Sequence, residues 1–308
     1  MANLFKKCFK YVFNKDYRYD INRALGFYNK MPDDEFLKRL FKSRLKYDLD
    51  LNNPKTFNEK LQWLKIHDRN PEYTTMVDKY KVRKYIADTI GEQYLIPLIA
   101  VYDKVEDIDF SKLPQKFVLK CNHNSGVGMC ICKDKSKLNI RKVKKGLKKG
   151  LKQDYYLTGR EWPYKNVERK IVCEKFMEDK DSPDLKDYKF MCFNGEVKCS
   201  FVCSERFSAE GLKVTFFDRD WQVMPFIRHY PKSEKIIDKP KNYQLMIELA
   251  EKLSKDIPFV RVDFYEVNGK VYFGELTFFP GNGLEEFEPE EYDRILGDYI
   301  NLEKVDGK

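Results

Sequence analysis

Residues 259–283 hold two strand-like runs, a tight turn and three charged side chains, and they restrict the fold more than any other stretch. Aromatic and β-branched residues fill both runs, and Asn268-Gly269 between them is a dipeptide typical of a β-hairpin turn. Arg261 and Asp263 are two residues apart, so their side chains share one face of the first strand. The sequence therefore predicts a hairpin with charged groups on one face.

The length of the turn decides whether Glu275, in the second strand, joins that face. A two-residue turn pairs Asp263 with Gly274 and puts Glu275 on the opposite face, whereas a three-residue turn with Gly269 in the left-handed region keeps all three charges together. Two carboxylates about 5 Å apart on neighbouring strands repel unless a cation lies between them, and oxygen ligands suit Mg²⁺. The alternative is a solvated surface with one Arg–Asp pair. The metal-site interpretation predicts a loop with an odd number of residues.

Composition bounds the class of protein. The 308 residues suffice for two or three subdomains, and 42% hydrophobic with 15% aromatic residues argues against disorder. A formal charge of +9 favours anionic partners. The eight cysteines show no CxxC pair, and the three histidines show no zinc spacing, so we expect reduced, buried cysteines in a cytosolic protein. We expect no membrane span and no signal peptide, because the apolar runs are too short.

The first 90 residues show helical patterns. Near the N-terminus apolar residues recur at helical spacing among lysines, which fits either a membrane-surface helix or a helix packed on the body: Leu4, Phe5, Cys8, Tyr11 and Val12 among Lys6, Lys7, Lys10 and Lys15. Acidic residues after Pro32 predict a second helix, a capping box of Thr56 and Glu59 predicts a third, and Asp78–Ile90 predicts a fourth.

A small-residue loop lies between two predicted strands farther along the chain. The strands are Lys116–Cys121 and Met129–Lys133, and the loop is His123–Gly128. Lys120 and Lys133 flank this loop, so cations and free N–H groups converge as a polyphosphate requires; the alternative is a plain hairpin. A lysine-rich helix is predicted over 136–155, strands over 169–177, 187–193 and 197–202, and a helix over 245–257.

The order of these pieces resembles the ATP-grasp superfamily, and more narrowly the TupA-like ATP-grasp family of cell-surface polysaccharide biosynthesis. The resemblance covers roughly residues 45–285 and rests on six motifs, at 53–60, 78–83, 117–123, 160–162, 187–190 and 274–280. It implies an α+β chain with the ATP-grasp fold, in which two α+β subdomains clasp ATP beside a helical N-terminal region. The implied divisions are a helical region over 1–78, a central and lid subdomain over 79–177, and a C-terminal subdomain with the metal site over 178–308.

The resemblance also implies roles for single residues. Lys120 and Lys133 would reach the phosphates, under a lid formed by Ser125, Gly126 and Gly128. Backbone groups of Lys175 and Met177 would read the adenine edge. The full ATP-binding set is Lys120, Ser125, Gly126, Gly128, Lys133, Glu174, Lys175, Phe176, Met177, Asp187 and Lys189.

The metal and catalytic roles follow from the same resemblance. Asp263 and Glu275 would hold Mg²⁺, while Arg261 and Lys189 would act in catalysis. Many relatives end the metal motif Glu-x-Asn, whereas this chain has Thr277 in the third position, so Thr277 and Asn282 are alternative ligands.

The implied activity is that of a Mg·ATP-dependent carboxylate–amine ligase, ADP-forming, that makes an amide through an acylphosphate. It would join an amino acid or another amine to a hexuronate carboxyl, on an anionic saccharide or lipid-linked glycan. An ATP-grasp-type sugar kinase and a glycosyltransferase of a polysaccharide locus are the alternatives. We expect no nucleic-acid partner, and a cytoplasmic protein that contacts the inner face of the membrane through its basic N-terminus.

Overall fold

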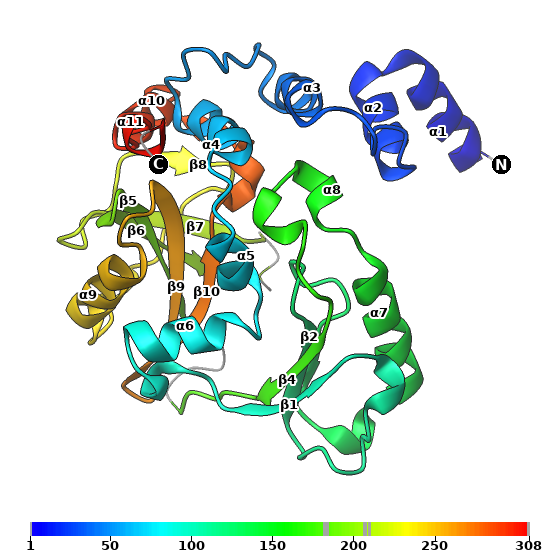
Figure 1. The fold of residues 1–308 in the computed structure, drawn as a ribbon, viewed down its shortest axis with the longest axis vertical. Helices are drawn as coiled ribbons and strands as arrows, with labels where there is room; N and C mark the ends of the chain where they lie inside the picture. The colour runs from blue at the N-terminus through cyan, green and yellow to red at the C-terminus, as the bar shows by residue number, and fades with distance from the viewer. Residues whose placement is uncertain (1, 181–184, 206–207, 209–210, 307–308) are drawn as a thin grey trace.

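The computed structural model describes residues 2–180, 185–205, 208 and 211–306 (Figure 1). The helices are α1 (Ala2–Phe13), α2 (Lys15–Ala24), α3 (Asp33–Leu45), α4 (Phe57–His67), α5 (Glu72–Val77), α6 (Val82–Thr89), α7 (Ile140–Lys152), α8 (Tyr156–Gly159), α9 (Tyr243–Leu253), α10 (Glu291–Asp298) and α11 (Glu303–Asp306). The strands are β1 (Leu98–Tyr102), β2 (Phe117–Cys121), β3 (Cys130–Cys132), β4 (Ile171–Lys175), β5 (Asp187–Phe193), β6 (Glu196–Ser204), β7 (Lys213–Phe217), β8 (Ile227–Arg228), β9 (Phe259–Val267), β10 (Lys270–Thr277) and β11 (Phe287–Glu288).

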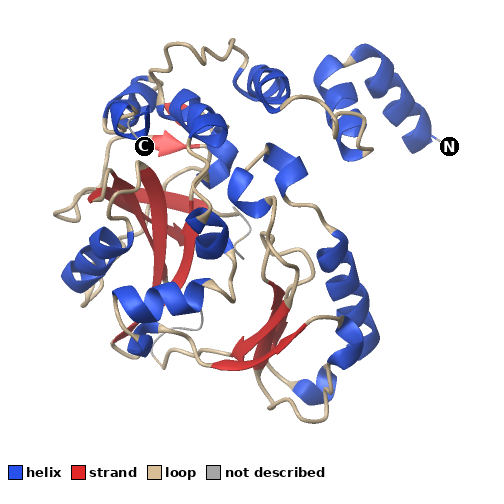
Figure 2. Cartoon of the chain, in the orientation of Figure 1, coloured by secondary structure: helices blue, strands red, loops and turns tan. Residues whose placement is uncertain are grey.

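The larger sheet has five antiparallel strands in the order β10-β9-β5-β6-β7. Along β5, Tyr188, Phe190 and Cys192 alternate with Lys189, and the apolar set packs against α9 with Tyr243 and Phe264. Helix α9 covers this face, as Figure 2 shows, which leaves the opposite face of the sheet turned toward the second sheet.

The smaller sheet has four antiparallel strands in the order β1-β4-β2-β3. Phe117, Leu119 and Ile171 point to one face and pack with Leu147 of α7, which runs along the outside of the sheet (Figure 1). Because side chains alternate along a strand, Lys120 and Glu174 point the other way, toward the larger sheet. Both are lining residues of one pocket between the two sheets.

The helices before the first strand divide between different cores. Helix α4 begins at the predicted capping box, which the structure confirms, and α4 and α6 each contribute side chains to the core of the larger sheet. Helix α3 begins at Asp33, as predicted, and has its own cluster around Phe36 and Phe41. Helices α1 and α2 extend away from the body (Figure 1). The α+β fold class is thereby confirmed, while the three sequence divisions stay a prediction.

The hairpin of β9 and β10 corrects the predicted turn. Its loop has two residues, because Val267 pairs with Lys270, and Asn268 and Gly269 adopt φ of 50° and 73°. The prediction of an odd-numbered loop is therefore wrong. Glu275 still pairs with Asp263, because a β-bulge between Phe273 and Glu275 inserts one extra residue. Glycine suits the bulged position 274, since a Cβ there would lie 3.1 Å from the Asp263 carbonyl oxygen.

The cysteine and membrane expectations have mixed outcomes. None of the eight cysteines, all of which lie in the described residues, forms a disulfide; five are buried, but Cys8 is exposed and Cys130 and Cys203 are half-buried, so the expectation that all are buried is wrong. In the part of the chain that the structure describes, no helix is both long and apolar enough to cross a bilayer.

Candidate active site

The inner face of the larger sheet carries a cluster of charged side chains from three adjacent strands. Arg261 on β9 donates through Nε to Asp263 Oδ1 at 2.6 Å and through Nη2 to Asp263 Oδ2 at 2.7 Å. The same Nη2 lies 3.0 Å from Glu275 Oε1 and 3.0 Å from Thr277 Oγ1 on β10. Lys189 on β5 pairs with Asp263 and lies 2.7 Å from Asp187 Oδ2. The bulge thus brings Glu275 and Thr277 beside Arg261, Asp263 and Lys189, the residues that the sequence analysis assigned to metal binding and catalysis.

The electrostatics of this cluster favour the charged forms of Arg261 and Glu275, whereas burial raises the pKa of Asp263 against the opposing effects of Arg261 and Lys189. Burial opposes the charge on Arg261, but Asp263 and Glu275 outweigh it and raise the pKa of the guanidinium. Burial would also raise the pKa of Glu275, yet Lys79, Arg261, Lys189 and Lys120 hold it at about 2. The Glu275 side chain is 42% exposed, so this carboxylate is ionised and accessible to a ligand.

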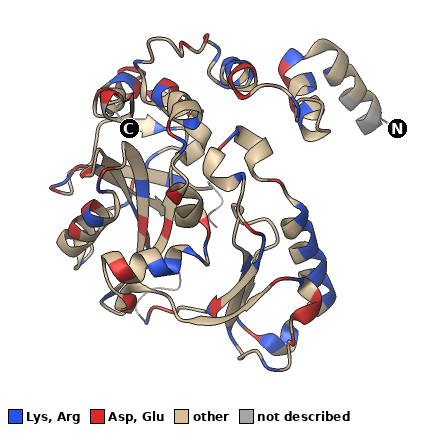
Figure 3. Ribbon diagram, viewed as in Figure 1, with Lys and Arg blue, Asp and Glu red and all other residues tan. Residues whose placement is uncertain are grey.

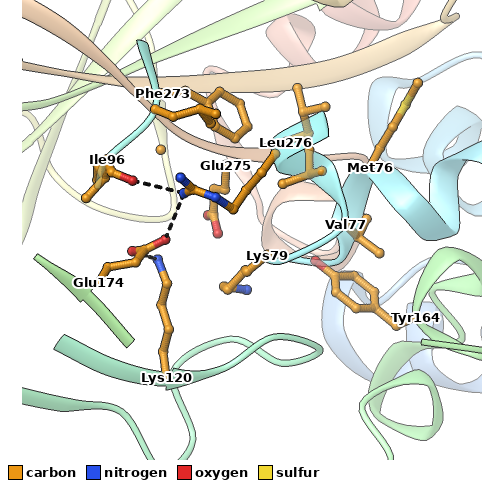
Figure 4. A pocket seen from close by; sticks show the side chains of 14 residues that line it. Met76, Val77, Lys79, Ile96, Lys120, Tyr164, Glu174, Phe273, Glu275 and Leu276 are labelled. Atoms are coloured by element: carbon orange, nitrogen blue, oxygen red, sulfur yellow. Dashed lines mark hydrogen bonds and ion pairs between the residues drawn. The ribbon is translucent and has the colours of Figure 1, made fainter. Parts of the chain in front are cut away.

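A second group of charges faces this cluster from the smaller sheet (Figure 4). Lys120 Nζ lies 2.6 Å from Glu174 Oε2, and Arg83 on α6 lies 3.9 Å from Glu174 Oε1. Arg83 also donates to the Ile96 carbonyl at 2.9 Å. Lys79, between the sheets, donates to the Asn124 carbonyl at 2.9 Å. Burial lowers the pKa of Lys79 while Glu275 opposes that shift, so the lysine lies in the same field as the hairpin carboxylate.

An apolar strip continues from Lys120 along the inner face of the smaller sheet. Val118 pairs with Ile131, and the exposed Met129 and Ile131 lie on the same face as Lys120. At the far end of the strip the Lys133 ammonium lies 5.9 Å from the centre of the Phe176 ring. A flat apolar strip between an ion cluster and an aromatic ring suits a purine base.

One sequence prediction about this region is corrected, and another is narrowed. Lys133 does not flank the glycine loop beside Lys120, because the register Phe117–Cys132 puts it at the opposite end of the β2–β3 hairpin. The Lys175 N–H donates to the Pro97 carbonyl at 2.9 Å, so of the Lys175 backbone groups only the carbonyl stays in the prediction for the adenine edge. The backbone of Met177 remains in the proposal for that role.

The glycine loop between β2 and β3 is anchored at both ends. Asn124 donates to the carbonyls of Val127 and Gly150 at 3.2 and 3.3 Å. A Cβ on Gly128 would lie 2.6 Å from the Gly146 carbonyl oxygen, so glycine at position 128 permits the close approach of the loop to α7. Gly126 and Ser125 are exposed, and a Cβ on Gly126 would meet nothing within 4 Å. Those two residues form the accessible tip.

Sequence reasoning missed several residues of this site. Lys79 and Arg83 line the pocket and belong to the motif at 78–83, to which the sequence assigns no binding or catalytic role. Tyr164 lines the same pocket (Figure 4). Asn282, considered as a metal ligand, instead accepts from Lys65 Nζ through its side-chain oxygen at 2.7 Å. Lys79 and Arg83 are more than 80 residues away from Tyr164 in the sequence, so no local sequence pattern indicates that they share a pocket.

Comparison with known proteins agrees with this geometry. A model of the TupA-like ATP-grasp family matches residues 59–301. The chain belongs to the TupA-like ATP-grasp family. No protein of curated function matches the sequence. The charge cluster, the apolar strip and the anchored loop of this ATP-grasp chain all lie within the matched residues.

Several solved structures resemble the chain at low identity. The ATP-grasp ligase PsnB with its minimal precursor is 8% identical, with a TM-score of 0.38, over 68% of this chain and 55% of that one. The D-alanine–D-alanine ligase of Bacillus anthracis with ATP is 16% identical, with a TM-score of 0.41, over 75% and 66%. The D-alanine–D-alanine ligase of Helicobacter pylori is 14% identical, with a TM-score of 0.42, over 81% and 70%. The chain thus spans less than two thirds of the length of the first two.

The side-chain oxygens of this site can be compared with the ligands that Mg²⁺ prefers. Asp263 accepts from Arg261 and Lys189, whereas Glu275 is bonded to Arg261 and Thr277 through Oε1 alone. Within the described ranges, no group of three or more carboxylate, histidine or cysteine side chains is arranged to hold a metal ion. Mg²⁺ in nucleotide sites commonly takes one or two protein carboxylates together with substrate phosphates. Two ionisable carboxylates beside lysines fit that mode of binding, with Thr277 as a neutral neighbour.

Proposed function

We propose that this protein is a Mg·ATP-dependent carboxylate–amine ligase that forms ADP, phosphate and an amide. The single observation that carries the proposal is the convergence of Lys189, Arg261, Asp263 and Glu275 opposite Lys79 and Lys120. The lysines and the arginine provide charge for transferred phosphate, and the carboxylates provide metal ligands. The apolar strip beside Lys120 accommodates the base, with Glu174, Phe176 and Met177 at its edge.

The proposed chemistry requires little of the protein beyond position and charge. A substrate carboxylate attacks the γ-phosphorus of ATP, and ADP leaves with the bonding electron pair. A neutral amine then attacks the acylphosphate carbonyl and the C–N bond forms. The nitrogen loses a proton to solvent, and the C–O bond breaks with its electron pair on the departing phosphate. Arg261 stabilises the transferred group and the oxyanion, while Lys189 orients Asp263 and Asp187. When bound, Mg²⁺ held by Asp263 and Glu275 would neutralise phosphate charge.

The substrates we propose are a hexuronate carboxyl and an amino acid or another amine, in surface-polysaccharide assembly. Helix α7 supports an anionic saccharide as the acid, because its exposed face carries Lys142, Lys145, Lys149 and Lys152 and the helix contains no acidic residue (Figure 3). The same helix packs on the outer face of the sheet whose inner face carries Lys120.

The ligase proposal predicts which substrates release phosphate. A screen of uronic acids against amines should yield ADP and phosphate together only when an acid and an amine are both present, because the acylphosphate is consumed by the amine. Coupled assays for ADP and phosphate measure this. ATP consumption that leaves a stable phosphorylated sugar, with no amine requirement, would contradict the ligase and favour a sugar kinase.

We further propose that α1 contacts the inner face of an anionic membrane. Phe5, Phe9 and Phe13 recur every four residues and are exposed, and the Phe9 and Phe13 rings lie 4.4 Å apart. Lys10 and Lys15 are exposed near them, while the side chains of Leu4, Lys6 and Lys7 lie outside the described residues.

The membrane proposal predicts binding to vesicles. The Phe9→Ser/Phe13→Ser double variant should bind phosphatidylglycerol-containing vesicles at least about 10-fold more weakly than the wild type, because each buried ring contributes about 1.5–3 kcal/mol. Co-sedimentation with these vesicles and with pure phosphatidylcholine vesicles measures it. Ile236→Ser removes an equally exposed apolar side chain elsewhere and should bind as the wild type does. Equal binding of both variants would refute the role of α1.

A further inference from the structure

Glu161 is a buried carboxylate that the proposed mechanism does not use. It is 4% exposed and lies between α8 and the short 3₁₀ helix Trp162–Tyr164. Its side chain forms neither a hydrogen bond nor an ion pair with any residue that the structure describes. A carboxylate removed from water without a partner costs several kcal/mol, so such a group calls for a cationic ligand.

The backbone around Glu161 is held firmly. The preceding Arg160 adopts the left-handed conformation at φ 56°, and its Nη2 atom donates to the carbonyls of Tyr28, Asn29 and Met31 at 2.8, 3.2 and 3.3 Å. Arg160 is itself buried and pairs with Asp33 at 3.5 Å. Glu161 therefore stands on a rigid support, as a pre-organised binding group should.

The surroundings of Glu161 connect it to the phosphoryl-transfer cluster. Lys65, Glu275 and Arg261 all act electrostatically on its carboxyl. Tyr155 and Tyr164 pack edge to face, with ring centres 4.6 Å apart, and both rings lie in the field of Glu161, Glu275 and Arg261. Tyr164 also lines the pocket that contains Lys79, Lys120 and Glu275. Glu161 thus lies within electrostatic range of the phosphoryl-transfer cluster and next to a tyrosine that lines its pocket.

Lys65 does not saturate this carboxylate. The three donors of the Lys65 ammonium are taken by Gln62 Oε1 at 2.9 Å, the Asn282 carbonyl at 2.9 Å and Asn282 Oδ1 at 2.7 Å. The interaction between Lys65 and Glu161 is therefore through space only. A cation that reaches Glu161 from the cleft finds an acceptor without a bonded partner and two aromatic rings beside it.

We propose that Glu161 binds the ammonium group of the amine substrate, and that Tyr155 and Tyr164 form the walls of that amine subsite. The inference rests on the ligase function proposed above and names the site of its second substrate. Burial raises the pKa of Glu161 to about 7 against the opposing effect of Lys65, so an arriving ammonium group favours the ionised carboxylate. The subsite selects a primary amine that is protonated in solution and rejects its N-acetylated form.

The test measures amine binding separately from turnover. Wild type, Glu161→Gln and Glu161→Asp, each with Mg²⁺ and a non-hydrolysable ATP analogue, are titrated by calorimetry and saturation-transfer NMR with the twenty amino acids, ethanolamine and putrescine. At least one of these amines should bind the wild type, and its Kd should rise at least about 10-fold in Glu161→Gln and less in Glu161→Asp, because a charged hydrogen bond is lost only in the former. Glu168→Gln, an exposed carboxylate on the same segment, should leave the Kd unchanged.

Two further arms separate the possible failures. If Glu161 merely balances the charge of Lys65, Lys65→Met/Glu161→Gln should restore amine binding, whereas the proposal expects the double variant to bind as weakly as Glu161→Gln. Absence of amine binding to the wild type, or equal affinity in Glu161→Gln, overturns the subsite. Phosphate release that needs acid and amine but has an unchanged amine KM in Glu161→Gln also overturns it while leaving the ligase intact. Amine binding that depends on Glu161, without phosphate release from any acid, keeps the subsite and overturns the ligase.

Discussion

Replacing Glu275 by glutamine is expected to lower ATP-dependent turnover by about 100- to 1,000-fold, a loss typical of removing one electrostatic group from an active site. Glu275 is the accessible carboxylate of the charge cluster, and four cations hold its pKa at about 2, so it is ionised whenever ATP binds. Glutamine keeps the shape and the hydrogen bond from Arg261 but removes the negative charge that a metal ion needs. Release of phosphate at saturating ATP and Mg²⁺ measures the effect.

A matched carboxylate in the same sheet provides the control. Glu196 on β6 forms an exposed pair with Lys198 at 2.7 Å, and Glu196→Gln should keep wild-type turnover because such surface pairs contribute at most about 1 kcal/mol. Thermal unfolding of both variants checks that the fold persists. Wild-type turnover in a folded Glu275→Gln variant would remove Glu275 from the mechanism.

The Lys120→Met variant is expected to bind ATP about 10- to 100-fold more weakly, because a charged contact to phosphate contributes about 1.5–3 kcal/mol. Lys120 is mostly buried beside Glu174 and belongs to the same pocket as Lys79 and Glu275. Lys133→Met should lose less affinity, since its ammonium lies over the Phe176 ring at the other end of the hairpin. Calorimetric titration with ATP measures both.

Without Lys120, Glu174 keeps only the ion pair with Arg83 at 3.9 Å, and its unbalanced charge could itself weaken ATP binding. A second variant therefore separates this indirect effect from the loss of a contact between Lys120 and the phosphates. Lys120→Met/Glu174→Gln removes the orphaned carboxylate, and its ATP affinity should stay low if Lys120 contacts the phosphates. Recovery of wild-type affinity in the double variant would show that Lys120 only neutralises Glu174. Lys112→Met, which changes an exposed lysine on a loop, should bind ATP normally.

Local chemistry explains why much of the fold could be predicted. The capping box of Thr56 and Glu59 acts within four residues, and helix α4 begins where it predicts. Alternation along β5 and β9 separates Lys189 and Asp263 from the apolar core residues, because side chains on a strand point to alternate faces. The Asn268-Gly269 turn is similarly local, since two residues with positive φ suffice to reverse the chain.

The register of the hairpin could not be predicted in the same way. The expectation that Glu275 shares a face with Asp263 is confirmed, but the reason given for it was wrong: Gly274 forms a bulge next to a two-residue turn. A bulge depends on how β10 packs against its neighbours, and a glycine in a strand is compatible with either arrangement.

The sequence by itself determined the strands that carry the site, the start of helix α4, the family resemblance and the identity of the charged hairpin residues, because each depends on neighbours close along the chain. Only the tertiary structure decided which distant side chains face those residues. Lys79 and Glu161 reach the cluster from separate segments, and Lys133 is carried away from Lys120 by strand register. Burial and long-range electrostatics, which assemble a catalytic cleft, exist only once the two sheets face each other.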